Sequence, residues 1–171
     1  MNEVYKYDSY NGFEEIDYSD FYDEIEDDDY YVMYLSKDAF KRFAEKNNIN
    51  EEVTNVALGK NYTIIEDDYT FASIDIINVG EDFHKKDVIG FYIENNRFII
   101  IDIYDRDSST NKAFNSLITK GLQTNTPGRF INYFLNKLII SHNEVYDKLR
   151  EDVERIDDVV LGNDFNEGCI N

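Results

Sequence analysis

Apolar residues recur at intervals of three and four along the C-terminal part of the chain. Such steps place side chains on one face of a helix, and Pro127 suits a first helical turn. The pattern therefore predicts a helix over Pro127–Gly162, with His142 on the same face as a core or interface histidine. About 35 residues at 1.5 Å each give about 50 Å, so we expect this helix to protrude or to pack against other chains. Its apolar stripe contains Phe130, Phe134, Leu138, Val145, Leu149, Val153, Ile156 and Val160.

Before this helix, apolar runs and turn residues alternate in a way that predicts strands and short helices. Strands are expected at Glu3–Asp8, Phe13–Tyr18, Tyr30–Leu35, Tyr62–Glu66, Tyr69–Val79, Val88–Ile93 and Arg97–Tyr104. Helices are expected after the caps Ser36 and Asn50, and over Ser108–Gly121 with Ser108 or Ser109 as its cap. The last two strands read as a hairpin, and their nearly continuous apolar runs are typical of a sheet covered on both faces.

These elements predict an α/β fold, a mixed β-sheet sandwiched by helices with a long protruding C-terminal stalk helix. We expect residues 1–126 to form the α/β domain. Residues 127–171 would be the start of the stalk helix and a polar tail, Asn163–Asn171, packed on the same domain.

The charge of the chain is strongly acidic, with a net value of −19. This charge repels nucleic acid and anionic lipid surfaces, whereas it attracts divalent cations and basic partners. The densest acidic run, residues 20–29, lacks the ligand spacing of a calcium loop and is interpreted as a solvated loop.

Residue counts exclude several kinds of site. One cysteine, Cys169, allows no internal disulfide and no cysteine-based zinc site, and two histidines, His84 and His142, are too few for a His-rich metal site. No nucleophile–base arrangement or phosphate loop is present, and the acid pairs Asp67-Asp68 and Asp105/Asp107 fall in turns. We therefore expect no enzyme activity and assign no catalytic residue.

Hydropathy gives no sign of membrane insertion. The first residues are acidic and unlike a signal peptide, and no apolar stretch approaches the ~20 residues that span a bilayer. We expect the polypeptide to be soluble as it stands.

Three stretches share their order of elements with a known family. The first, Tyr34–Leu58, has a strand end followed by two helices, and the second, Asp87–Asp102 (DVIGFYIENNRFIIID), has a hairpin with a short polar turn. The third, Arg129–Gly162, lies within the predicted long helix. In this order the chain resembles the cytoplasmic N-terminal domain of CorA-type magnesium and cobalt transporters. The third stretch carries the strongest likeness, to the region that leads into the family's stalk helix.

The resemblance implies a function and partners. The chain would be the soluble cytoplasmic part of a divalent-cation (Mg²⁺/Co²⁺) transporter, at the cytoplasmic face of the membrane, and would support or regulate transport by membrane helices downstream of Asn171. Mg²⁺ would be the candidate cofactor, nucleic acid would not be a partner, and the chain would form a homo-oligomer, which is a pentamer in the family.

Departures from the family pattern bear on metal binding. Some members carry acids, which contribute to magnesium sensing between subunits, where this chain has Asn55, Val56, Asn136 and Ile140. We therefore carry over no metal ligand.

Two other functions are consistent with the sequence. The charge would suit a free-standing acidic binding module that mimics nucleic acid in a basic cleft. The long helix would suit a structural oligomerisation domain without an ion function.

Overall fold

The structure is a computed structural model that describes residues 2–8, 10–18, 29–59, 63–77, 86–94, 96–119 and 127–167. Most of the acidic run at 20–29 and His84 lie outside the described residues, as do the side chains of Val56, Ile140 and His142. The chain divides into two compact units, Met1–Leu138 and Ile139–Asn171.

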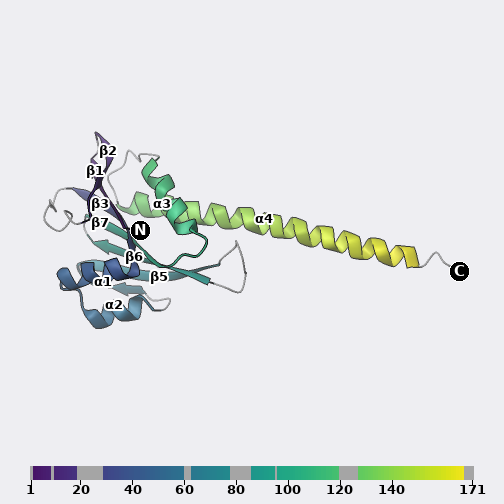
Figure 1. Cartoon of the computed structure of the whole chain (residues 1–171), viewed down its shortest axis with the longest axis horizontal. Coiled ribbons are helices and arrows are strands. Elements are labelled where there is room, and N and C mark those ends of the chain that lie inside the picture. The colour runs from purple at the N-terminus through teal and green to yellow at the C-terminus, as the bar shows by residue number, and fades with distance from the viewer. Residues whose placement is uncertain are drawn as a thin grey trace. The chain divides into compact units, whose positions relative to one another are not determined.

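One mixed sheet of seven strands forms the centre of the first unit (Figure 1). Its strand order is β2-β1-β3-β7-β6-β5-β4, in which β3 and β7 are parallel and the other neighbours are antiparallel. The predicted hairpin is confirmed by the pairing of β6 with β7. The strands are β1 (Glu3–Asp8), β2 (Gly12–Ile16), β3 (Tyr30–Ser36), β4 (Thr63–Ile65), β5 (Tyr69–Ile77), β6 (Lys86–Glu94) and β7 (Arg97–Tyr104).

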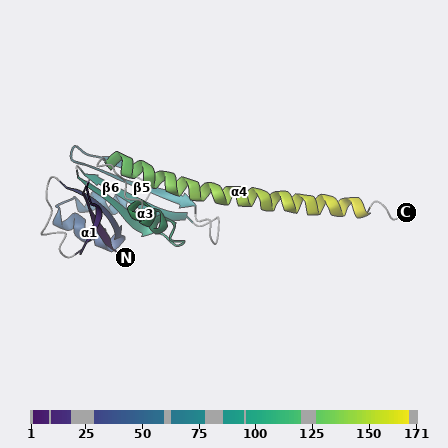
Figure 2. The ribbon, with the colours of Figure 1, turned by 90° about the horizontal axis from the view of Figure 1, so that it is seen from above.

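Helices cover both faces of this sheet (Figures 1 and 2). The described helices are α1 (Lys37–Lys46), α2 (Glu51–Ala57), α3 (Ser109–Thr119) and α4 (Pro127–Glu167). The layer of α1 and α2 lies on one face, and α3 with the beginning of α4 lies on the other. The predicted α/β class, a mixed sheet sandwiched by helices, is confirmed.

The core under α1 is aromatic. Successive strand residues point to opposite faces, so Met33 and Leu35 of β3 turn toward α1 while Val32 and Tyr34 turn toward α3. Phe40 of α1 packs against strand aromatics with ring centroids about 5 to 6 Å apart, a spacing that favours edge-to-face contacts. These distances are 5.1 Å to Phe71 and 5.6 Å to Tyr92.

The core on the opposite face holds the first turns of α4. Phe130 lies 5.2 Å from Tyr7, and Phe134 lies 5.8 Å from Phe91, measured between ring centroids. Phe130, Phe134 and Leu138 are buried in one cluster with α3 residues. The stripe predicted from periodicity is therefore a packing surface over this part of the helix.

The N-cap residues predicted from the sequence locate the starts of α1 and α2 correctly. The Oγ of Ser36 accepts a hydrogen bond from the Ala39 amide at 3.3 Å, and the Oδ1 of Asn50 accepts one from Glu52 at 2.8 Å. Both predicted N-caps are confirmed.

The end of α4 differs from the prediction. The helix runs through Gly162 to Glu167, so residues 163–167 of the expected polar tail are helical. One glycine in a helix interior costs about 1 kcal/mol, which does not end a helix of this length when no proline follows. None of the helices in the described ranges combines the length and the apolar character that a membrane-spanning segment requires.

Candidate functional site

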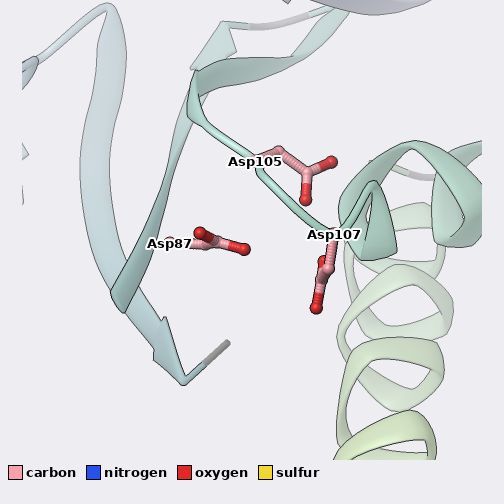
Figure 3. Close-up of side chains that lie close together, drawn as sticks. All are labelled: Asp87, Asp105 and Asp107. Carbon is pink, nitrogen blue, oxygen red and sulfur yellow. The ribbon is translucent and has the colours of Figure 1, made fainter. Parts of the chain in front are cut away.

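A group of three carboxylates lies where β6, β7 and α3 come together. Asp87 is the second residue of β6, and Asp105 and Asp107 lie in the connection from β7 to α3. Val88 pairs with Tyr104, which brings the start of β6 beside the end of β7. In Figure 3 the Asp87 side chain points from β6 toward the segment that carries the other two aspartates. One oxygen of each carboxylate lies within 4.8 Å of the others.

Asp105 connects the start of α3 to the sheet. Its Oδ1 accepts a hydrogen bond from the Thr110 amide at 3.4 Å, and its Oδ2 accepts one from the Asn111 amide at 3.2 Å. The Tyr34 hydroxyl of β3 donates to the same Oδ2 at 3.3 Å. The carboxylate thereby satisfies amides of the first helical turn, which have no partner within the helix.

Asp107 completes this arrangement, because its Oδ1 accepts a hydrogen bond from the Ser109 amide at 2.8 Å. In the described part of the chain, the side chains that accept hydrogen bonds from the first amides of α3 are therefore aspartates. The sequence had predicted a cap by Ser108 or Ser109. Ser108 has a φ of 58°. An N-cap residue normally has extended backbone angles, so this left-handed conformation explains why the serine hydroxyl does not serve as the cap.

The electrostatics of the group are set by burial and by like charges. Burial raises the pKa of the Asp105 carboxyl, the hydrogen bonds from Asn111 and Thr110 lower it, and the charges of Asp102 and Asp107 raise it, with a net upward shift. Burial also raises the pKa of the Tyr34 hydroxyl, with Asp102 and Asp105 adding to the effect. Tyr34 therefore stays a neutral donor to Asp105.

The chemistry open to this group is the binding of a proton or of a hard cation. Mg²⁺ and Ca²⁺ prefer carboxylate oxygens, and among the described residues this is the one group of three potential metal-ligating acids. Asp87 is 1% exposed, while Asp105 and Asp107 are partly exposed. Capping α3 already accounts for the positions of Asp105 and Asp107, so these two aspartates have a structural role without an ion.

Known proteins resemble this chain in structure rather than in sequence. No protein-family model and no curated protein matches the sequence. The solved structure of the full-length CmaX protein matches with a TM-score of 0.75 and 8% identity, over 94% of this chain and 51% of that chain. The CorA magnesium transporter from Methanocaldococcus jannaschii matches with a TM-score of 0.69 and 15% identity, over 95% of this chain and 51% of that chain.

A third match is the cytoplasmic domain of ZntB from Vibrio parahaemolyticus RIMD 2210633, with a TM-score of 0.68 and 10% identity over 90% of this chain and 64% of that chain. This chain has the CorA-type cytoplasmic domain fold. The resemblance read from the sequence is thereby confirmed at the level of the fold. The chain spans about half the length of the CmaX and CorA chains it matches.

Two of the positions at which some CorA-type domains carry acids, Asn55 and Asn136, have side chains that the structure describes. Asn55 is exposed on α2, in the layer on the face opposite to α3. Asn136 is exposed on α4, and its amide donates to the Oδ1 of Asn132 at 3.1 Å. Neither asparagine offers a carboxylate ligand.

Sequence reasoning missed Asp87. The predicted strand began at Val88, one residue after this aspartate, and no role was predicted for Asp87 itself. Asp87 pairs with Ile76 of β5 and lies near Asp105 and Asp107, and neither neighbourhood is visible in the residues around it in the sequence. By contrast, the pair Asp105/Asp107 was noticed, but as solvated turn acids, whereas the structure partly buries both.

Proposed function

We propose that this chain is the cytoplasmic domain of a CorA-type divalent-cation transporter and acts at the cytoplasmic face of the membrane without enzyme activity. The transport step would belong to membrane segments outside residues 1–171. The observation that carries the proposal is the agreement in fold with CorA over 95% of the chain at a TM-score of 0.69.

In this function α4 links the domain to the membrane part. Its first turns are fixed by Phe130, Phe134 and Leu138, which are buried in the domain core. The remainder of α4, which is helical to Glu167, would continue toward the membrane segments. The acidic charge of −19 would raise the local concentration of cations.

We further propose that the chain self-associates through the second half of α4. Tyr146, Val153 and Ile156 are exposed there, and Leu149 is partly buried. Their spacing of three, four and three is the heptad spacing of coiled-coil seams. A second copy of the chain would cover this apolar face, and Mg²⁺ would reduce the repulsion between the acidic subunits.

The first experiment measures the thermal midpoint and the oligomeric mass of the chain with and without millimolar Mg²⁺. A ligand that binds the folded state raises the midpoint. We expect a higher midpoint or a larger species in Mg²⁺ than in NaCl of matched ionic strength. An identical result in the two salts would contradict the proposed effect of Mg²⁺ on the chain and leave only the likeness in fold. It would then favour the acidic binding module.

A second experiment tests the transporter assignment independently. The DNA downstream of the Asn171 codon is sequenced and searched for apolar segments of ~20 residues, the length that spans a bilayer. Finding them in frame would support a transporter. A reading frame that stops after Asn171 would overturn the proposal, even if Mg²⁺ binds the chain.

A further inference from the structure

No further inference is drawn: the strongest candidate, the group of Asp87, Asp105 and Asp107 between the start of β6 and the N-terminus of α3, is an acidic cluster whose hydrogen bonds to α3 are those of a helix cap, and nothing else in the described part of the chain points to a ligand there.

Discussion

The two halves of α4 carry the same apolar periodicity but use it differently. In the first half, Phe130, Phe134 and Leu138 are at most 4% exposed. In the second half, Val153 and Ile156 are 54% and 59% exposed. Periodicity thus identifies the apolar face of a helix but does not show what covers that face. The exposed fractions in the structure show that the first half of the face belongs to the domain core and that the second half is open to a partner.

The polar residues of the two regions also differ in their roles. In the first unit, Asp105 is half-buried and holds amides of α3. In the second half of α4, Arg150 pairs with Glu154 at 3.6 Å and Arg155 with Asp152 at 3.0 Å. Exposed pairs of this kind contribute about 0.3–0.5 kcal/mol each. Local interactions therefore support the second half, and tertiary packing supports the first.

Phe134→Ala is expected to have the largest effect. Removing a fully buried aromatic side chain costs about 3–5 kcal/mol, so the free energy of unfolding of the chain should fall by this amount in urea titration. Phe134→Leu serves as the matched control and should lose much less, because most of the apolar volume remains. A loss below about 1 kcal/mol for the alanine variant would contradict the packing described for α4.

Asp105→Ala is expected to have an intermediate effect. It removes a charged acceptor of two backbone amides and of the Tyr34 hydroxyl, and the loss of such a cap costs about 0.5–2 kcal/mol. The same urea titration measures the change. Asp68→Ala, at an exposed turn residue, is the control, and equal losses in the two variants would show that Asp105 is not a cap.

The pH dependence of the free energy of unfolding is expected to change less than the values above, and it reports on the Asp105 carboxyl in particular. Because the pKa of Asp105 is raised above 3.8 in the folded chain, its contribution to stability is present below pH 3.8 and is lost as pH rises through the folded pKa. Asp105→Asn should remove this part of the profile. Unfolding free energies of both proteins from pH 3.5 to 7 provide the test, with exposed Asp68→Asn as control. A constant difference between wild type and Asp105→Asn across this range would refute the shift.

Val153→Ser with Ile156→Ser should have the smallest effect on stability, within about 0.5 kcal/mol for surface positions. If a second copy covers this face, the double variant lowers the oligomeric mass in sedimentation velocity. Glu154→Ser with Asp158→Ser, at exposed polar positions of the same helix, should leave the mass unchanged. An unchanged mass for both double variants would exclude this apolar face as the assembly surface.

Local signals in the sequence were enough to predict most of the elements. Caps such as Ser36 and Asn50 act within three residues of their partners, and the strands show as apolar runs between turn residues. The hairpin of β6 and β7 was predictable because its short polar turn joins two apolar runs.

The carboxylate group was not predictable in the same way. Asp87 and Asp105 are close only because β6 pairs with β7 and the chain then turns into α3. The cap of α3 was assigned to serine because serine is a preferred N-cap residue. The backbone at Ser108 is left-handed, and two aspartates accept the hydrogen bonds of the first amides instead. Both errors arise from contacts that depend on the whole fold.

The single parallel pairing in the sheet has a consequence for how the domain folds. The strands β1, β2 and β3 form one local antiparallel group, and β4, β5, β6 and β7 form another. Only β3 and β7 connect them within the sheet, where Tyr31 lies beside Arg97. Pairings between residues far apart in sequence form slowly, because the entropy of closing the loop between them is lost before their contacts form. We expect the two groups to form first and the β3–β7 seam to close last, as the step that sets the folding rate.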